Sequence, residues 1–339
     1  MKQLIHLLTT LLLLVLLAAC VPVETANLAS DGAAADAIAA PEEEAMAETR
    51  TITHVLGTTE APTNPQRIAV VGYNEVEELL ALSITPIAKL FETPAHFPLE
   101  AEDIPLIGHN GQPNLERLLV LEPDLIIGVE WAMAEFYDEL TQIAPSVVVP
   151  RTTFAEWKDA LRFTADVVGR SDQVEELLAD YDQRVAEVRV AIGNERLDTI
   201  KVTAFRPYGG GDGFLIWIDR SFPDVIMAEV DIQRPEAQRA QLPDDAERID
   251  NLSLEMIPLL NADVIFFALP ESGVFTASAS EDLANYIEDI EASPLWAQLE
   301  AVQNDQVFKV DGAAWNEGSI IGANVVLDDL ERFLAEAGN

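Results

Sequence analysis

The pattern of residues Phe154–Ile192 most constrains what this chain can fold into, because it is helical throughout. These residues include no proline, one internal glycine (Gly169) and apolar side chains at helical spacing. Apolar residues that recur every three or four positions give a helix one face for a core. We predict two consecutive helices, the second beginning near Ser171 and running about six turns. A helix this long would be an unusual connector between two folded segments, because most connections inside proteins are short or flexible.

Short apolar runs alternate with helical patterns before this connector. The expected strands are Ile68–Val71, Pro86–Ala88, Leu125–Gly128 and Val147–Val149, and the expected helices are Glu75–Leu82, Leu115–Leu121 and Ala132–Ile143. Fully apolar strands separated by amphipathic helices indicate a parallel sheet that is covered on both faces. Asn114 is expected to cap the helix that follows it.

The same alternation restarts after the connector. The expected strands are Lys201–Phe205, Phe214–Ile218, Asp263–Ala268 and Gln306–Val310, and the expected helices are Phe222–Ala228, Leu254–Leu260, Glu281–Ile290 and Ile320–Ala335. The glycine-rich run Gly209–Gly213 is expected to be a turn. We therefore predict an α/β chain with two lobes of mostly parallel sheet, joined by the long helix, with a ligand cleft between the lobes. The expected boundaries are 51–152 for the N-terminal lobe, 153–193 for the connecting helices and 194–339 for the C-terminal lobe.

The N-terminus has the pattern of a secretory signal that ends in a lipid-attachment site. Lys2 is followed by a nearly continuous apolar run from Leu7 to Ala19, shorter than the roughly 17–25 residues of a membrane-spanning helix. Leu17-Ala18-Ala19-Cys20 resembles the bacterial lipobox, whose cysteine becomes the lipidated first residue of the mature protein. We expect residues 1–19 to be a lipoprotein signal peptide, with an ordinary secretory signal as the alternative. The acidic, alanine-rich residues 20–50 are expected to be a disordered tether that holds the folded part outside the cytoplasmic membrane.

The charge of the chain excludes several classes of partner and site. Its 339 residues include 59 Asp and Glu against 20 Lys and Arg, a net charge of −39, while 49% are hydrophobic. This apolar content is typical of a folded protein, and the acidity excludes nucleic acid, because phosphates need a basic surface. The single cysteine excludes an internal disulfide framework and cysteine-rich metal sites. Four histidines leave little material for a multi-histidine metal centre.

Several sequence blocks resemble one family and occur in its order. They are Asn64–Val71 with Ala81–Ala88, Gly111–Glu116 with Leu121–Ile127, Leu252–Glu255 with Asn261–Ile265, Ser293–Trp296, Val310–Gly312 and Trp315-Asn316. Together with the lipoprotein start, these blocks are similar to the periplasmic-type substrate-binding proteins of iron–siderophore ABC transporters, a class with cobalamin- and haem-binding members. The resemblance covers nearly all of residues 51–339. It implies a binding protein that captures a ferric siderophore between its lobes.

The resemblance also implies the partners of the chain. A permease dimer with a cytoplasmic ATPase would receive the ligand, and one carboxylate of each lobe would dock on the permease. Glu116 in the Asn-Leu-Glu block and Glu255 in the Ser-Leu-Glu block match those two positions. Both are also first-turn acids that favour the helix macrodipole, and the two roles are compatible. We expect a monomer without a resident cofactor and without metal ligands, since the chelator already holds the iron.

We expect the ligand contacts at the ends of strands, where ligands of α/β sheets bind. An oxygen-rich, usually anionic chelate needs a few cations and flat aromatic rings. Arg206 is the leading cation, because it follows a predicted strand and because an arginine there recurs in siderophore-binding members of the family. The other expected contacts are Tyr73, Asn74, His109, Trp131, Tyr208, Trp217 and Trp315. A helix cap for Asn74, a structural hydrogen bond for His109 and core packing for Trp217 remain alternatives.

Other strand-end and loop residues complete the expected site. The further candidates are the cations Lys89, Arg151, Arg220 and Arg239, and Asn110 beside His109. Trp157 and Trp296 are expected to be packing residues. With so few basic residues, a highly charged tricatecholate ligand is disfavoured.

Several other functions are disfavoured by motifs that the sequence lacks. The chain has no nucleophile elbow and no metal-ligand spacing, so we expect no enzyme. It also lacks the histidine set of zinc- or manganese-binding transport proteins. Cobalamin and haem remain alternatives within the same fold, with Tyr73, Tyr208 or His109 as an axial ligand of haem. The lipid anchor is compatible with a periplasm or with the outer face of a cell membrane.

Overall fold

A computed structural model describes residues 48–94, 96–109, 111–208, 213–218, 220–239, 248–269, 277–316 and 318–336, which belong to one compact unit. The predicted signal peptide, the lipidation of Cys20 and most of the predicted tether lie outside the described residues, as does most of the Gly209–Gly213 turn. The first strand, β1 (Thr49–His54), begins inside the predicted tether, so Thr49 and Arg50 belong to the folded part. In the described ranges, no helix is long and apolar enough to cross a bilayer.

The N-terminal half contains a fully parallel sheet in the order β4-β3-β7-β8. Its strands are Ala88–Lys89 (β4), Ile68–Val71 (β3), Leu125–Val129 (β7) and Ser146–Val149 (β8), and its main helices are α1 (Asn74–Ala81), α2 (Leu115–Val120) and α4 (Tyr137–Ile143). Every residue of these strands is buried, which explains their continuous apolar runs. The predicted elements of this half are confirmed with small shifts at their ends. The helix predicted over Ala132–Ile143 is interrupted before α4.

Two antiparallel hairpins that the sequence pattern did not predict accompany this sheet. Strand β1 pairs with β2 (Gly57–Pro62), and both contact β8. Strand β5 (Gly108–His109) pairs with β6 (Gln112–Pro113) directly before α2. Asn114 caps α2 as expected, because its side-chain oxygen accepts a hydrogen bond from the amide of Arg117 at 2.9 Å.

The C-terminal half contains a mixed sheet in the order β11-β10-β9-β12-β13. Its strands are β9 (Val202–Pro207), β10 (Phe214–Trp217), β11 (Arg248–Leu252), β12 (Val264–Leu269) and β13 (Val307–Asp311). Strands β9, β12 and β13 run parallel, whereas β10 is antiparallel to both of its neighbours. Strand β11 was not predicted, because its residues are mostly polar and form no apolar run.

Helices cover this second sheet at the positions that the sequence pattern predicted. The main ones are α8 (Phe222–Glu229), η4 (Leu254–Leu260), α10 (Ala277–Ala292) and α12 (Ile320–Glu336). The segment η4 is a 3₁₀ helix that contains Pro258, and a proline in this position prevents regular α-helical bonding. The shorter helical segments of the chain are η1 (Leu99–Ala101), α3 (Glu130–Met133), η2 (Ala134–Phe136), η3 (Phe154–Glu156), α7 (Asn194–Leu197), α9 (Glu236–Arg239), η5 (Trp296–Gln298) and α11 (Glu300–Gln303).

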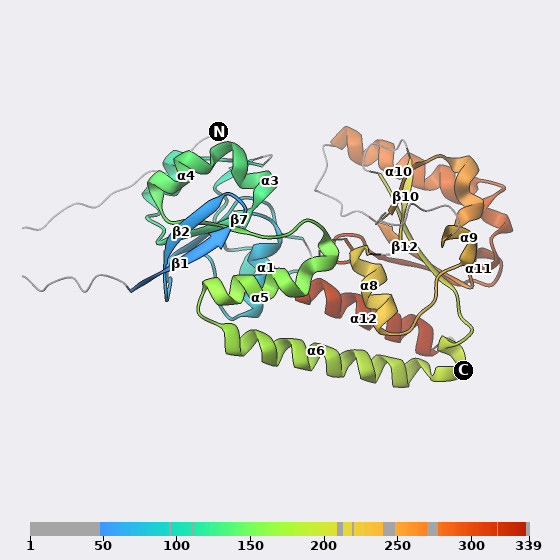
Figure 1. Cartoon of the computed structure of the whole chain (residues 1–339). Helices are drawn as coiled ribbons and strands as arrows, with labels where there is room; N and C mark the ends of the chain where they lie inside the picture. The colour runs from blue at the N-terminus through green and yellow to red at the C-terminus, as the bar shows by residue number, and fades with distance from the viewer. Residues whose placement is uncertain are drawn as a thin grey trace, which may run out of the picture. The chain divides into compact units, whose positions relative to one another are not determined.

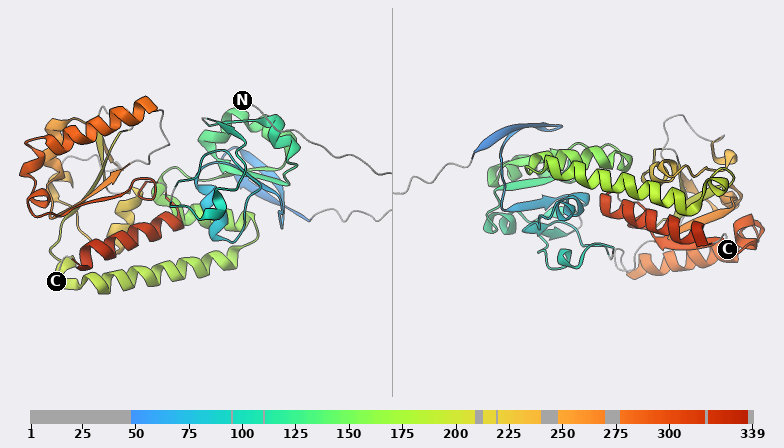
Figure 2. Two further views of the ribbon diagram at one scale, coloured as in Figure 1. Left: turned by 180° about the vertical axis from the view of Figure 1, so that it is seen from behind. Right: turned by 90° about the horizontal axis from the view of Figure 1, so that it is seen from below.

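The predicted connector consists of α5 (Trp157–Val167) and α6 (Ser171–Ile192). Helix α6 has 22 residues, which is close to the expected six turns. Figures 1 and 2 show the last helix, α12, alongside α6, and the two helices are in contact. Gly169 separates α5 from α6 at a φ of +70°, in a region of backbone conformation that favours glycine.

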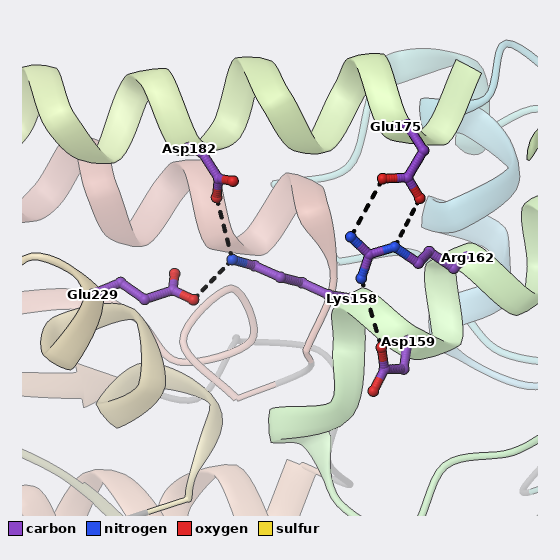
Figure 3. A network of polar contacts seen from close by, with 6 residues as sticks. All are labelled: Lys158, Asp159, Arg162, Glu175, Asp182 and Glu229. Atoms are coloured by element: carbon purple, nitrogen blue, oxygen red, sulfur yellow. Dashed lines mark hydrogen bonds and ion pairs between the residues drawn. The ribbon is translucent and has the colours of Figure 1, made fainter. Parts of the chain in front are cut away.

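Charged side chains tie the connector to the C-terminal half (Figure 3). Lys158 of α5 lies 2.8 Å from Glu229 of α8 and 3.4 Å from Asp182 of α6. Arg162, one turn further along α5, lies 2.8 Å from Glu175 of α6. These side chains are partly exposed, so each pair contributes at most about 1 kcal/mol to stability. Their main effect is to set how α5, α6 and α8 align.

One cluster of buried side chains extends from the N-terminal sheet through the connector to α12. Trp157 belongs to this cluster, and its ring centroid lies 5.0 Å from that of Tyr181 in α6 and 6.3 Å from that of Phe222 in α8. Trp157 and Trp296 are both buried, which confirms their predicted packing role. The core therefore joins the two halves through the connector.

We predict that Trp157→Ala lowers the free energy of unfolding by about 3–5 kcal/mol, because it leaves a cavity where α5, α6 and α8 meet. Trp131→Ala is the matched control, since it removes the same side chain from a position that is 65% exposed. The control should change stability by no more than about 0.5 kcal/mol. Urea denaturation followed by circular dichroism measures both values, and equal losses would contradict the packing role of Trp157.

Candidate ligand-binding site

Three aromatic rings lie in a row at the carboxyl ends of adjacent strands in the N-terminal sheet. Tyr73 follows β3, Phe91 follows β4 and Trp131 follows β7. The ring centroids of Tyr73 and Phe91 are 5.6 Å apart, and those of Phe91 and Trp131 are 5.5 Å apart. We name these three residues the aromatic strip. The rings are tilted against one another, at 63° between Tyr73 and Phe91 and 52° between Phe91 and Trp131. Trp131 is mostly exposed and the other two residues are partly exposed, so a ligand has access to aromatic surface here.

Phe91 was not among the predicted contacts. The predicted strand ended at Ala88, whereas β4 includes Lys89 and places Phe91 just beyond the strand end. The signal that could have identified it is the one that identified Tyr73 and Trp131, namely an aromatic residue directly after a strand. A correct strand boundary was needed to apply that rule to Phe91.

The β5–β6 hairpin borders the aromatic strip. A Cβ atom added at Gly111 would lie 3.8 Å from the ring of Phe91, so the tip of the hairpin lies beside this ring. His109 contributes its backbone to β5, while its side chain and all of Asn110 lie outside the described residues. The expected roles of His109 and Asn110 stay predictions.

Asn74 adds little accessible surface to this end of the sheet. It is the first residue of α1, and Tyr73 occupies the N-cap position without a side-chain cap bond. The alternative that Asn74 caps the helix is therefore wrong. Asn74 is only 2% exposed, so its side chain is directed into the protein.

Lys89 and Arg151, two of the candidate cations, are both engaged inside the protein. Lys89 is buried and donates hydrogen bonds to the carbonyl of Ala101 at 2.6 Å and to the hydroxyl of Thr93. Burial lowers the pKa of Lys89. Arg151 forms an ion pair with Glu78, and its Nη1 donates a hydrogen bond to the carbonyl of Gly318 at 2.6 Å. In this arrangement neither side chain is available to a ligand.

Arg206 and Tyr208 lie at the end of the first strand in the C-terminal half. Arg206 is inside β9, where it pairs with Leu215 of β10, and its side chain is partly exposed. The Tyr208 hydroxyl donates a hydrogen bond to Asp250 and accepts one from the amide of Asn251 at 3.4 Å. Burial and the bond to Asp250 raise the pKa of Tyr208, so its hydroxyl stays protonated. This strand end therefore presents a guanidinium beside a neutral phenol.

The structure describes the side chain of only one of the other two candidate cations in this half. Arg220 is exposed and has a left-handed backbone, with a φ of +71°. Arg239 ends the short helix α9, and its side chain lies outside the described residues. Both stay predictions as ligand contacts.

Trp315 and Trp217 lie in the core, contrary to their expected place in the cleft. Trp315 is fully buried, its Nε1 donates a hydrogen bond to Asp329 at 2.8 Å, and its ring lies 4.7 Å from that of Phe266. Trp217 is 3% exposed. Like Trp315, it belongs to the buried cluster that extends from the N-terminal sheet through the connector to α12. Spacing in the sequence could not separate these residues from Trp131, because all three stand near predicted strand ends.

Glu116 and Glu255 occupy equivalent places in the two halves. Each is exposed in the first turn of a short helix, α2 or η4. A carboxylate oxygen of Glu255 accepts a hydrogen bond from the hydroxyl of Ser253 at 3.0 Å. Leu119 and Val120, one turn beyond Glu116, are 59% and 80% exposed. The surface around Glu116 thus combines a carboxylate with apolar side chains, as protein-binding surfaces often do.

Comparison with known proteins identifies the family. The model of the periplasmic binding protein family matches residues 68–314. A probable siderophore-binding lipoprotein of Bacillus subtilis is 31% identical over 300 residues, covering 86% of this chain and 89% of that protein. An achromobactin-binding periplasmic protein of Dickeya dadantii is 28% identical over 284 residues, covering 81% and 88%. The crystal structure of Staphylococcus aureus SirA complexed with staphyloferrin B superimposes with a TM-score of 0.73 at 26% identity, covering 84% of this chain and 98% of SirA. The chain therefore belongs to the periplasmic binding protein family.

Proposed function

We propose that this chain is the extracytoplasmic substrate-binding component of an ABC importer and that its ligand is a ferric siderophore. The observation that carries this proposal is the aromatic strip of Tyr73, Phe91 and Trp131 at the strand ends of the N-terminal sheet. Relatives and structural neighbours named for siderophores support it. The ligand would lie between the two lobes, with Arg206 as its contact in the C-terminal lobe.

The chemistry of a siderophore fits these residues. The chelator fills the coordination sphere of iron, so the protein has to recognise the outside of the complex rather than the metal. Aromatic rings cover the flat apolar parts of the chelator. An arginine pairs with carboxylate or other oxygen donors through its planar fork. No catalytic group is needed for this role.

The internal contacts of the basic residues in the N-terminal half indicate which class of siderophore would bind. Lys89 and Arg151 both bind partners inside the protein, so the described strand ends of the N-terminal sheet offer aromatic surface rather than positive charge. A complex with a high negative charge would lose its hydration without enough compensating cations. We therefore expect a complex of low net charge, such as a hydroxamate or a mixed hydroxamate and carboxylate, to bind more tightly than a tricatecholate.

Delivery would use the membrane anchor and the two exposed carboxylates. Lipidated Cys20 would hold the chain at the membrane, and the acidic tether would let the folded part reach the permease. Glu116 and Glu255 would each meet basic residues of one permease subunit, with Leu119 and Val120 adding apolar contact beside Glu116. The importer would include a permease dimer and a cytoplasmic ATPase, and the binding protein would act as a monomer.

We predict that Trp131 reports ligand binding by its fluorescence. The other four tryptophans are Trp157, Trp217, Trp296 and Trp315, and all are buried. Gallium complexes lack the charge-transfer absorption of iron complexes, so an emission change caused by a gallium siderophore reflects contact rather than energy transfer. Titration of the purified chain with gallium hydroxamate, catecholate and citrate complexes should change the emission with the hydroxamate class. In Trp131→Phe most of this change should be lost.

Calorimetry with the ferric complexes, haem and cobalamin provides the control for this titration. Trp131→Phe keeps an aromatic ring in the strip, so affinity should fall by less than about tenfold. Trp296→Phe, which changes a buried tryptophan far along the sequence, should keep the emission change. Binding of haem or cobalamin without binding of any iron chelate would overturn the proposed ligand class.

We predict that Glu116→Ala combined with Glu255→Ala abolishes uptake while ligand affinity stays within about twofold. The reason is that both carboxylates are exposed and belong to the proposed docking surface rather than the ligand site. Uptake of the radioactive ferric siderophore by cells and calorimetry on the purified chain measure the two effects. Glu139→Ala combined with Glu288→Ala removes the same charge from exposed positions of the two halves and should leave uptake unchanged. Lost affinity in the first variant would contradict the docking role.

A further inference from the structure

The imidazole of His96 lies between carboxylates from the two halves of the fold. Its Nε2 is 2.9 Å from Oε1 of Glu77, and its Nδ1 is 3.6 Å from Oδ2 of Asp311. Glu77 belongs to α1 of the N-terminal half, whereas Asp311 is the last residue of β13 in the C-terminal sheet. The side chains of His96 and Glu77 are 4% and 0% exposed. The ring therefore makes a nearly buried contact between the two halves.

The protonation state of this ring follows from its two partners. A carboxylate accepts hydrogen bonds, and a neutral imidazole has one N–H group and one lone pair. In the neutral ring, one of the two carboxylates would face that lone pair. Only the imidazolium form places a positive charge opposite both carboxylates: Nε2 hydrogen-bonds Glu77 at 2.9 Å, and Nδ1 faces Asp311 at 3.6 Å, a distance that suits an ion pair rather than a hydrogen bond. The geometry thus matches a positively charged His96.

Asp311 is held for this interaction by its own backbone contacts. Its Oδ1 accepts hydrogen bonds from the amides of Ala313 at 2.8 Å and Ala314 at 3.3 Å, which leaves Oδ2 directed at His96. Burial alone would raise the pKa of Asp311, but the bond and charge of His96 and these two amides outweigh burial and lower the pKa. Asp311 therefore stays ionised while His96 is charged.

The charged groups around the ring are mostly acidic and come from α1, from the segment after β8, from β13 and from α12. They are Glu77 and its α1 neighbours Glu75 and Glu78; Arg151, which pairs with Glu78; Asp311 at the end of β13; and Asp329 of α12, which interacts with Asp311. Burial raises the pKa of Glu75 and that of Glu78. Protons on Glu75 and Glu78 would reduce the negative charge of the cluster. They would not remove the two carboxylates that contact the ring directly, which are those of Glu77 and Asp311.

We propose that His96 is a positioning residue that ties the two lobes together when doubly protonated and releases them when it loses a proton. In the charged form it links α1 to the end of β13. As the pH rises, loss of one ring proton removes the positive charge that faces both carboxylates, and this link breaks. Helix α1 begins beside Tyr73 of the aromatic strip, so the link also sets how that strip stands relative to the C-terminal lobe. This last consequence alone rests on the proposed function.

Spin-label distances between the lobes test the proposal without any ligand. The full chain would carry Cys20→Ser, which removes its one natural cysteine, together with Glu135→Cys and Glu300→Cys at exposed positions of the two halves. We expect a narrow distance distribution at mildly acidic pH and a broader one at mildly alkaline pH. With His96→Gln the distribution should be broad at both values, because the amide makes no charged bond to Asp311. Equal widths at both pH values in the chain with His96 would overturn the proposal.

Two further variants separate this effect from general loss of structure. His54→Gln changes another buried histidine, which hydrogen-bonds Thr59 inside the N-terminal half, and it should leave the pH-dependent broadening intact. Asp311→Asn keeps the size of the side chain but removes its charge, so the broadening should move to lower pH. If His54→Gln removed the broadening as His96→Gln does, the assignment to His96 would be wrong.

Nitrogen-15 NMR of the His96 ring measures its protonation directly in the unsubstituted chain, without the spin labels or the substitutions described above. At mildly acidic pH both ring nitrogens of His96 should carry protons, and one should lose its proton over the same pH range in which the distances broaden. A His96 ring that is neutral throughout this range would refute the proposal. Because none of these measurements uses a ligand, their failure is distinct from a failure of the proposed siderophore binding.

Discussion

The buried ion pair between Arg151 and Glu78 is the contact on which the arrangement of the two halves depends. Arg151 follows β8, Glu78 lies in α1, and the same guanidinium donates a hydrogen bond to Gly318 just before α12. Thr164 of α5 donates a hydrogen bond to Glu78 at 2.5 Å, so four segments meet at one pair of charges. Burial raises the pKa of Glu78 and the charge of Arg151 opposes this rise, so loss of Arg151 would leave a buried carboxyl group that favours its protonated form. Gly318 has a φ of +66°, and a Cβ there would lie 2.5 Å from the carbonyl oxygen of Phe154, so this junction requires glycine.

This use of charge explains the character of the candidate site. The chain has 20 basic residues against 59 acidic ones, and several of the basic residues bind acids that join helices, such as Lys158 with Glu229 and Arg162 with Glu175. Cations committed to internal pairs are not available to neutralise a ligand. The described strand ends of the N-terminal sheet therefore offer aromatic rings, and the net charge of the chain says little about the ligand.

Periodicity predicted the parts of the fold in which burial determines the residue type. The strands of the parallel sheet are buried on both faces, so their sequences are continuous apolar runs. The buried apolar residues of the connector recur at helical spacing. The β1–β2 hairpin and β11 have mostly polar sequences, so their pairing leaves no such signal. Part of the site was predictable for the same reason, because Tyr73 and Trp131 stand at clear strand ends. Trp315 was misassigned because the sequence does not show that its loop turns the ring into the core, where it binds Asp329.

Helix α1 connects these features, because it bears on the ligand site and on the junction between the halves at once. Tyr73 precedes its first residue and belongs to the aromatic strip, while Glu77 and Glu78 on its buried side bind His96 and Arg151. The helix has only eight residues, so these groups move as one rigid element. Displacement of Tyr73 by the proposed ligand would therefore also displace the acids that contact the C-terminal half through His96 and Arg151. Coupling between the candidate ligand site and lobe position would then need no long pathway, since Tyr73 directly precedes the helix that carries Glu77 and Glu78.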